Sequence, residues 1–227
     1  HNILKKSLDG EYLVCYNRVT NVTLRLLLLQ KRGIFMPRSF MFTKEEIVAA
    51  AVQLTREKGI DAVSARSLGE KLGASSRPIF SYFKSMDEVK EAIAESATEI
   101  YNGYIETEIK SGRYSSYKAN CMAYIRFAKE EKELFKMLFL TDTSSEDVSD
   151  DSDENEIEEV KPLVKILQKQ LNFSRENAEL FFSETWVTVH GIAAMLATND
   201  LDWTDSYILN VLNDVFTGIK YGIENRS

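Results

Sequence analysis

Apolar side chains recur at the spacing of an α-helix from residue 43 onward. The first run lies at positions i, i+3, i+4 and i+7, which share one face of a helix, and consists of Ile47, Ala50, Ala51 and Leu54. Thr43 and Glu46 precede it at the spacing of a capping box. Gly59 can adopt the left-handed conformation that ends a helix. The pattern predicts a helix over about 43–58.

Two shorter helices are expected next. Ser64 is suited to cap the first and Gly73 to end it, while Ser75 or Ser76 can cap the second. The apolar positions are Leu68 and Leu72 in the first helix, and Ile79, Tyr82 and Phe83 in the second. Two short helices joined by a tight turn with a glycine are typical of a helix-turn-helix.

Longer helices account for the rest of the periodic pattern. They are expected over about 86–111, 114–129, 134–139, 159–171, 174–196 and 204–222. Pro162 would lie in the first turn of the fourth, where its missing N–H has no partner to lose. The chain has only three prolines and ten glycines, so few strong helix breakers interrupt it. We predict an all-α fold with an N-terminal three-helix unit and a C-terminal helical domain.

Negative charge is concentrated in one segment. Ten acidic residues and no basic residue lie between Asp142 and Val160, so the rest of the chain carries a net charge of +3 against −7 for the whole. Residues 141–155 are acidic and serine-rich with almost no apolar side chains, which predicts a mobile loop. The segment lacks the ligand spacing of a calcium-binding loop. Because the acidity is local, it does not exclude a DNA-binding surface elsewhere.

The first 35 residues differ in pattern from the rest. The stretch 12–29 is rich in β-branched and aromatic residues, and Met36 is a plausible native start. We therefore expect 1–35 to be an extension outside the native fold, derived from a tag or from upstream translation. The alternative is a native basic arm that lies along DNA, with cations at Lys5, Lys6, Arg18, Arg25, Lys31 and Arg32.

Other classes of protein find little support in the sequence. The apolar run at Leu26–Leu29 is far too short to span a bilayer, which favours a cytoplasmic protein without a membrane partner. Cys15 and Cys121 form no CxxC pair and no cluster with histidine, so we expect reduced thiols, no metal and no cofactor. His190 has Glu184 nearby in sequence, but no nucleophile, base and orienting acid form a recognisable arrangement, and we predict no enzymatic activity.

The chemistry of the second short helix fits a surface that reads DNA. Ser75, Ser76 and Ser81 are short, so a helix that carries them can approach the major groove closely. Arg77 can pair with a guanine edge or a phosphate. A phenol and an ammonium suited to phosphate follow at Tyr82 and Lys84. Pro78 is tolerable in the first turn of this helix and can contact a thymine methyl group.

Residues 43–89 resemble the TetR/AcrR family of transcriptional regulators. The resemblance implies that the three-helix unit binds the major groove, and that a helical C-terminal domain provides dimerisation and a ligand pocket. It places Arg66, Ser76, Arg77, Pro78, Phe80 and Tyr82 on DNA, with Lys84 on phosphate. The complete set of candidate DNA-binding residues is Thr43, Ser64, Arg66, Ser75, Ser76, Arg77, Pro78, Phe80, Tyr82 and Lys84.

Two positions depart from the pattern of this family. Phe80 stands where a tyrosine is usual, and Met86 stands where a lysine is frequent. The changes remove a hydroxyl group and a positive charge, so we expect weaker nonspecific affinity for DNA.

A second resemblance to the family covers residues 181–196, with a Trp-Val-x-x-His-Gly stretch. Small residues there permit close helix approach, and the last helix carries more apolar surface than one face needs, which favours a four-helix dimer interface. The candidate interface residues are Val187, Gly191, Ala194, Ile208, Leu212, Val215, Phe216 and Ile219. The candidate effector-binding residues are Tyr124, Phe127, Phe182, Trp186 and His190.

These features predict three segments: an extension at 1–35, a DNA-binding domain at 36–85, and an effector-binding and dimerisation domain at 86–227. We expect a homodimeric regulator, a repressor released from a palindromic double-stranded operator by a largely apolar small molecule. The alternative is a helical ligand-binding or enzymatic protein in which the N-terminal helices are only a scaffold. Salt-sensitive DNA binding would favour the regulator. Turnover of a small molecule would favour the alternative.

Overall fold

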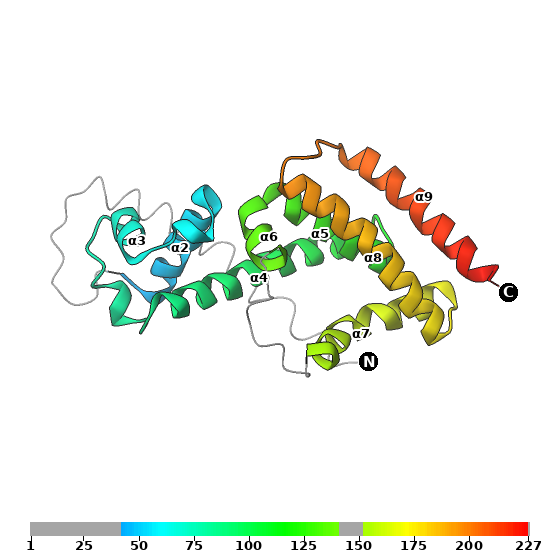
Figure 1. Ribbon diagram of the computed structural model, residues 1–227, viewed down its shortest axis with the longest axis horizontal. Coiled ribbons are helices and arrows are strands. Elements are labelled where there is room, and N and C mark those ends of the chain that lie inside the picture. Colours follow the sequence, from blue (N-terminus) through cyan, green and yellow to red (C-terminus); the bar gives the residue numbers. More distant parts are fainter. Residues whose placement is uncertain (1–41, 141–151, 227) are drawn as a thin grey trace. The chain divides into compact units, whose positions relative to one another are not determined.

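The computed structural model describes residues 42–140 and 152–226, and within 152–160 it describes the backbone alone. The expectations for 1–35, and for the acidic loop over 141–151, lie outside the described residues. Figure 1 shows the helices in chain order: α2 (Lys44–Lys58), α3 (Ala65–Leu72), α4 (Met86–Ser111), α5 (Ser116–Glu130), α6 (Lys132–Phe139), α7 (Ser152–Leu171), α8 (Arg175–Ala197) and α9 (Asp205–Glu224). Short 3-10 turns lie at Ile60–Ala62 and Ile79–Ser81, and the described part of the chain contains no strand. The predicted all-α class is confirmed.

The predicted start and end of α2 are confirmed in atomic detail. The backbone N–H of Thr43 donates to Glu46 Oε2 at 3.0 Å, and the N–H of Glu46 donates to Thr43 Oγ1 at 3.2 Å. These bonds satisfy donors that the first turn of a helix leaves without a partner. Gly59 follows the helix with φ +80°, a conformation that favours glycine. The predicted apolar face, which includes Ile47 and Leu54, is buried.

Helix α3 is held at both ends by local hydrogen bonds. Ser64 Oγ accepts from the N–H of Ser67 at 3.1 Å, and Ser67 Oγ accepts from the N–H of Ser64 at 2.9 Å. Gly73 ends the helix in the left-handed region at φ +67°. Leu68 and Leu72 are buried, as predicted. The helix thereby presents one apolar face to the core and leaves the other in solvent.

The chain divides into two compact units. Among the described residues, the N-terminal unit comprises those up to Leu54 together with Ala62–Ile93, and the C-terminal unit comprises Thr55–Asp61 together with those from Ala94 onward. Helices α2 and α4 therefore each contribute residues to both units. The domain boundary expected at residues 85 and 86 stays a prediction. It coincides with the start of α4, whereas the two units divide within that helix, between Ile93 and Ala94.

The C-terminal unit is a layered set of helices with α8 at its centre. Helix α8 packs against α5, α6, α7 and α9, and α5 also packs against α6 and α7. Large side chains fill the space between these helices, including the fully buried Tyr124, Phe127, Phe135, Leu134 and Leu167. Among the described residues, α8 is the one helix long and apolar enough to cross a bilayer. Its packing on four helices is what the core helix of such a unit requires.

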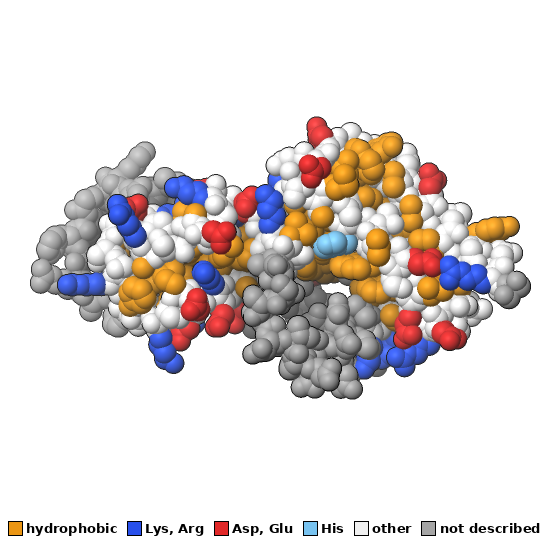
Figure 2. All heavy atoms as spheres, viewed as in Figure 1, with side chains coloured by type: hydrophobic (Ala, Val, Ile, Leu, Met, Phe, Trp, Pro, Cys, Tyr) orange, Lys and Arg blue, Asp and Glu red, His pale blue; other side chains and the backbone are white. Residues whose placement is uncertain are grey.

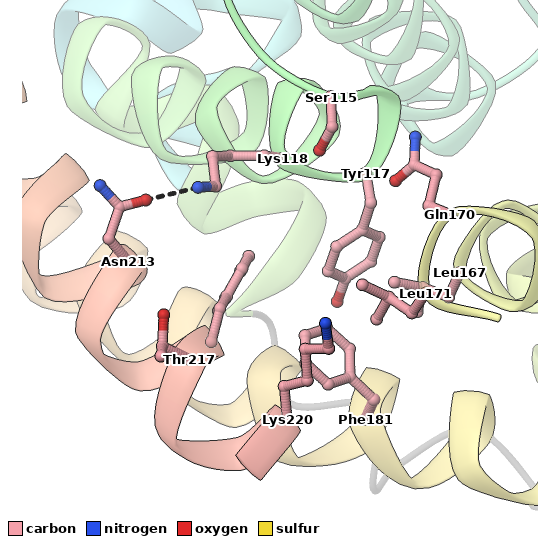
Figure 3. Close-up of a pocket in the computed structure, with 11 residues that line it drawn as sticks. Ser115, Tyr117, Lys118, Leu167, Gln170, Leu171, Phe181, Asn213, Thr217 and Lys220 are labelled. Carbon is pink, nitrogen blue, oxygen red and sulfur yellow. Dashed lines mark hydrogen bonds between the residues drawn. The ribbon is translucent and has the colours of Figure 1, made fainter. Parts of the chain in front are cut away.

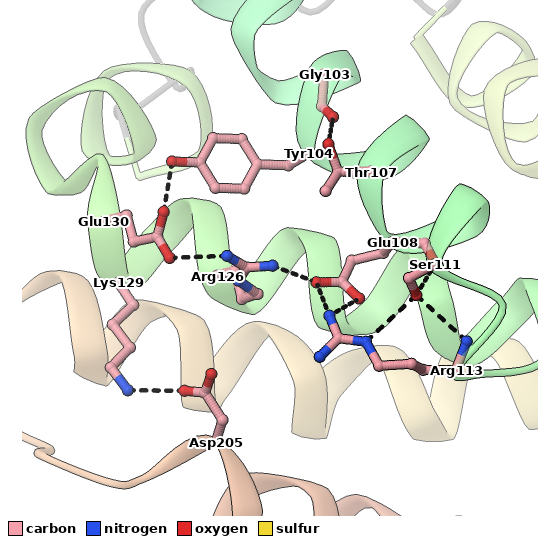
Figure 4. A network of polar contacts seen from close by, with 10 residues as sticks. All are labelled: Gly103, Tyr104, Thr107, Glu108, Ser111, Arg113, Arg126, Lys129, Glu130 and Asp205. Atoms are coloured by element: carbon pink, nitrogen blue, oxygen red, sulfur yellow. Dashed lines mark hydrogen bonds and ion pairs between the residues drawn. The ribbon is translucent and has the colours of Figure 1, made fainter.

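A buried carboxylate connects the end of α4 to α5 (Figure 4). The side chain of Glu108 is 1% exposed, and it accepts hydrogen bonds from Arg126 Nη1 and, at 3.2 Å, from Arg113 Nη2. Arg126 Nη2 also donates to Glu130, which accepts from the hydroxyl of Tyr104 at 2.9 Å. The hydrogen bond to Glu108 raises the pKa of Arg126, so the guanidinium stays charged. The two cations offset the cost of burying the carboxylate.

The start of α7 differs from the prediction. The helix begins at Ser152 rather than near Glu159, so residues 152–155 are helical and Pro162 lies in the helix interior. The lack of apolar side chains in this segment favours a loop. Acidic residues near a helix N-terminus are favoured by its dipole, however, and glutamate has high helix propensity.

Candidate nucleic-acid interface

The segment after Gly73 follows a tighter path than the α-helix predicted from Ser75 or Ser76. The N–H of Ile79 donates to Ser76 O at 3.1 Å, and the N–H of Tyr82 donates to Ile79 O at 3.1 Å. Both bonds have the three-residue spacing of a 3-10 helix, which spans only Ile79–Ser81. The predicted α-helix is therefore wrong in type and length.

Proline accounts for much of this difference. Pro78 has no N–H to donate, and it disfavours the α conformation for the residue before it, Arg77. Ser81 Oγ donates to the carbonyl of Arg77 at 3.2 Å, so a side chain supplies a partner for that carbonyl. Pro78 was predicted to lie in the first turn of an α-helix. These local bonds instead keep the residues after Pro78 in a short 3-10 turn.

Two buried side chains anchor the turn. Ile79 is fully buried and Phe83 is nearly so, as expected for Phe83 from its spacing. Between them, Phe80 is 48% exposed, and Arg77 and Ser81 are exposed. The turn therefore presents a cation, an aromatic ring and a hydroxyl group to solvent.

Three cations of the N-terminal unit remain in water. The side chain of Lys84 is 93% exposed and that of Arg66 is 89% exposed, and Arg77 is exposed as well. Arg66 Nε lies 3.0 Å from Glu70 Oε1, and Lys84 Nζ lies 3.8 Å from an oxygen of Glu88. Exposed pairs of this kind contribute little free energy, so a phosphate can replace the acidic partner.

Tyr82 is less available than the sequence suggested. The residue is half-buried, and its hydroxyl donates to the carbonyl of Phe42 at 3.0 Å. A bond from this hydroxyl to phosphate would require that internal bond to be exchanged. The predicted DNA contact of Tyr82 stays a prediction with this added requirement.

The remaining candidates have local structural roles. Thr43 and Ser64 cap α2 and α3, and the carbonyl of Ser76 accepts the bond that begins the turn. All ten candidate DNA-binding residues belong to the N-terminal unit, and none is buried: Thr43, Ser64, Arg66, Ser75, Ser76, Arg77, Pro78, Phe80, Tyr82 and Lys84.

Gly69 positions the turn and was missed by the sequence argument. A Cβ atom at this residue would lie 3.1 Å from the carbonyl oxygen of Ala74 and 3.3 Å from backbone atoms of Ser75 and Ser76. The N–H of Ala74 donates to Gly69 O at 2.9 Å. The missing side chain thus permits the backbone of the turn to approach α3. A glycine in the middle of a predicted helix was the available signal.

The candidate effector residues lie in the C-terminal unit, and most are in contact. The hydroxyl of Tyr124 is 2.9 Å from His190 Nδ1, and the ring of Trp186 lies 4.9 Å from that of Tyr124 and stacks on Phe182. Tyr124, Phe182 and Trp186 border a small cavity of about 40 Å³, which His190 does not line. Phe127 does not line this cavity and packs on Tyr101, Tyr104 and the phenylalanines of α6, so its contact with an effector stays a prediction.

The candidate dimer residues on α9 require a correction. Ile208 and Leu212 are fully buried within their own unit. Phe216 directs its ring toward Tyr117 and Phe181, at centroid distances of 5.8 and 5.7 Å. These three residues recur at i, i+4 and i+8, the stripe by which α9 packs on its own unit. Ile208 and Leu212 are therefore core residues and cannot contact a partner without rearrangement. Phe216 is half-buried, and its contact with a partner stays a prediction.

Other parts of α8 and α9 leave apolar surface uncovered. Val187 is 72% exposed, Gly191, Ala194, Val215 and Ile219 are half-buried, and Tyr221 is 69% exposed. Figure 2 shows hydrophobic side chains gathered on the face where α8 runs. A Cβ atom added at Gly191, Gly218 or Gly222 would meet nothing within 4 Å. This surface can accept another helix at close range.

Comparisons with known proteins agree with this arrangement. A model described as bacterial regulatory proteins of the tetR family matches residues 47–93, which include α3 and the turn. A model described as a tetracyclin repressor-like C-terminal domain matches residues 117–208, within the C-terminal unit. The fold and the exposed turn define a DNA-binding transcriptional regulator with a helical C-terminal unit. The chain belongs to the TetR family.

One solved structure supports this fold. A TetR family transcriptional regulator from Vibrio parahaemolyticus is 17% identical with a TM-score of 0.54, over 77% of this chain and 96% of that one. A TetR variant from Acinetobacter baumannii AYE in complex with minocycline is 13% identical with a TM-score of 0.44, over 80% of this chain and 92% of that one. No curated protein sequence matches the chain.

Proposed function

We propose that the protein is a homodimeric repressor that binds a palindromic operator and is released from it by a small, largely apolar molecule. The observation that carries the proposal is the exposed turn after α3. Phe80 and Ser81 are exposed between the buried anchors Ile79 and Phe83, and Arg77 is exposed just before them. A DNA-recognition element requires exposed side chains that are held in place by rigidly packed residues.

Each cation has a distinct role in this proposal. Arg77 lies on the turn and contacts a base edge, where a guanine offers two acceptors. Arg66 and Lys84 flank it and bind phosphates, which sets the register of the protein without reading sequence. Two such heads in a dimer would read half-sites whose centres are roughly 34–50 Å apart.

The dimer would form through the uncovered apolar surface of α8 and α9. Val187, Gly191 and Ala194 lie on one side of α8, and Val215 with Gly218 lies on the side of α9 away from Phe216. Glycine and alanine permit close approach of helix backbones, and Val187 contributes apolar area that water now covers. An isologous four-helix contact is consistent with this geometry.

The effector would enter the C-terminal unit beside Tyr124, Phe182 and Trp186. The cavity there has a volume of only about 40 Å³, so binding requires the aromatic side chains to move apart. Burial raises the pKa of Tyr124, which keeps its phenol neutral and suits an apolar ligand. The bond between Tyr124 and His190 is the polar contact that a ligand can exchange.

The release of DNA would follow from a change in helix positions. The last turn of α2 belongs to the C-terminal unit, where Arg56 donates two hydrogen bonds of 2.7 Å to Glu131 at the start of α6. Helix α2 continues from there into the N-terminal unit, as α4 does. A shift of α6 would therefore be passed to α2, and a coupling of about 1–3 kcal/mol suffices for a useful switch.

The proposal is tested by DNA binding with salt dependence. We would locate a palindrome upstream of the coding region and titrate it with the protein by fluorescence anisotropy. Arg77→Ala should reduce affinity by roughly 1–3 kcal/mol and relax specificity at one base pair. Lys84→Ala should weaken all sequences alike and reduce the salt slope by about one. Arg175→Ala, an exposed arginine of α8 outside the proposed interfaces, is the matched control.

Two results would contradict the proposed DNA recognition by the turn after α3. If Arg77→Ala leaves both affinity and base preference unchanged, the turn after α3 does not read DNA. If the wild-type protein binds every duplex equally at all salt concentrations, operator recognition itself is wrong.

A further inference from the structure

A second cavity lies in the C-terminal unit, between the start of α5, the end of α7, the start of α8 and the middle of α9 (Figure 3). Its volume is about 190 Å³. The rings of Tyr117, Phe181 and Phe216 form an aromatic wall, with centroids 5.7 to 6.1 Å apart. Leu167 and Leu171 of α7 add aliphatic surface. The site is distinct from the cavity beside Trp186, although the ring of Tyr117 borders both.

The charged groups that line this cavity are of one sign. Lys118 and Lys220 contribute ammonium groups, and no carboxylate is among the described residues that line it. Lys118 Nζ donates to the neutral amide oxygen of Asn213 and lies 5.8 Å from the centroid of the Phe216 ring. The acid nearest Lys220 is Glu224, at 3.6 Å in an exposed pair outside the lining. Neither cation is thus neutralised by a carboxylate inside the cavity.

Neutral polar groups complete the lining. Ser115, Gln170 and Thr217 can donate or accept hydrogen bonds, and Figure 3 shows them around the aromatic wall. Ser115 is the N-cap of α5, so the cavity also borders the positive end of that helix dipole. The positive end of the dipole adds to the positive electrostatic field of Lys118 and Lys220.

We propose that this cavity binds a small organic acid, a monocarboxylate with a short aromatic or apolar body. The carboxylate would bind Lys118 and Lys220, and the body would pack against Tyr117, Phe181 and Phe216. A carboxylate replaces Asn213 as the partner of Lys118 with a stronger, charge-assisted hydrogen bond. A volume of about 190 Å³ fits one small acid rather than a lipid.

The proposal goes beyond the effector site beside Trp186 and does not depend on it. The α9 residues that line this cavity are Asn213, Phe216, Thr217 and Lys220. They lie on the opposite side of α9 from Val215 and Gly218, which we assign to the dimer surface. The cavity can therefore be filled in the monomer and in the proposed dimer alike.

The test uses 3-phenylpropanoate as the probe and 3-phenylpropanamide as its neutral isostere. Calorimetric titration of the full chain should give one site for the acid and about tenfold weaker binding of the amide. Lys118→Met and Lys220→Met should each weaken the acid about tenfold, while Lys118→Arg retains most affinity. Lys165→Met, an exposed lysine of α7 that does not line the cavity, should behave as wild type.

A blocking variant guards against loss of folding. Thr217→Trp changes an exposed residue at the rim and should prevent binding of the acid, with the helical circular dichroism signal unchanged. Equal affinity for acid and amide would overturn the proposal. Wild-type affinity in folded Lys118→Met and Lys220→Met, or in Thr217→Trp, would also overturn it, because the acid would then occupy another site such as the cavity beside Trp186.

Discussion

The N-terminal and C-terminal units bury similar apolar side chains but treat their polar groups differently. In the N-terminal unit, Arg66, Arg77 and Lys84 are exposed. In the C-terminal unit, Glu108 is buried between two guanidinium groups, and the hydroxyl of Tyr117 bonds to buried Thr185 at 2.7 Å. Charges left in water remain available to a phosphate, whereas charges bound inside the fold stabilise one arrangement of helices.

This difference separates recognition from stability. A substitution at an exposed cation of the N-terminal unit should change DNA affinity and leave the free energy of unfolding nearly constant. A substitution in the C-terminal core should do the reverse. Substitutions at buried and at exposed positions test this separation.

The largest effect is expected from one substitution made at a buried and at an exposed position. Leu212→Glu places a carboxylate in the core of the C-terminal unit and should lower the free energy of unfolding by more than about 4 kcal/mol. Val187→Glu should preserve helical content but dissociate the proposed dimer, because a charge would enter the apolar contact. Circular dichroism in urea and sedimentation velocity measure the two outcomes.

Two results would contradict this pair of expectations. A folded, monomeric Leu212→Glu variant would return that residue to the subunit interface. An intact dimer of Val187→Glu would place the interface away from the middle of α8.

The buried carboxylate should have the next largest effect. Glu108→Gln removes the charge that balances Arg113 and Arg126, and we expect the free energy of unfolding to fall by about 3 kcal/mol. Glu179→Gln removes an exposed partner of Arg175. This substitution should leave the free energy of unfolding nearly unchanged. Urea denaturation at one protein concentration compares the two variants. Equal free energies of unfolding would show that the hydrogen-bond network around Glu108 does not stabilise the fold.

Gly69 offers a change that should affect binding more than folding. In Gly69→Ala the new Cβ atom lies 3.1 Å from Ala74 O, so the turn must shift by a few tenths of an ångström. Higher helix propensity offsets part of that cost, and we expect unfolding to change by less than about 1 kcal/mol. Operator affinity should fall about tenfold, because the reading groups move with the turn.

Gly103→Ala is the control for this substitution. Gly103 lies within α4, and its added Cβ atom meets nothing within 4 Å. Alanine there should raise the free energy of unfolding by about 0.5–1 kcal/mol without a change in operator affinity. If Gly69→Ala behaves the same way in the anisotropy titration, the turn does not depend on this close approach.

Cys121 in the C-terminal core gives a prediction about a chemical rate rather than about affinity or stability. Burial raises the pKa of its thiol to about 12, so only about one molecule in ten thousand carries the reactive thiolate at pH 8. Alkylation by iodoacetamide at this pH should be at least about a hundredfold slower in the folded protein than in urea, where the pKa returns toward its ordinary value. Mass spectrometry of the peptide containing Cys121 follows the rate, and equal rates would mean that this core opens readily.

Much of the secondary structure was predictable because its signals are local. Caps at Thr43 and Ser64 form as their sequence positions indicated, since each bonds within three residues of itself. The type of the segment at Ile79–Ser81 was not predictable from periodicity. Its apolar spacing fits a helix, while the effect of Pro78 on backbone bonding decides against one.

The candidate sites divide along similar lines. Exposed DNA candidates follow from residue type and spacing in a short segment. The exclusion of Ile208 and Leu212 from the dimer surface does not, because an apolar residue of a helix can face its own core or a partner. Only the packing of α5, α8 and α9 distinguishes these possibilities.

The all-α class, the ends of most helices and the position of the candidate DNA-binding segment after Gly73 follow from the sequence alone. Tertiary structure decided which faces of α8 and α9 remain uncovered, how closely Gly69 approaches the turn, and that Lys118 and Lys220, which lie far apart in the sequence, border one cavity. Helix signals act over a few residues along the chain. Burial and the meeting of charges depend on helices brought together from distant positions, which one-dimensional periodicity does not specify.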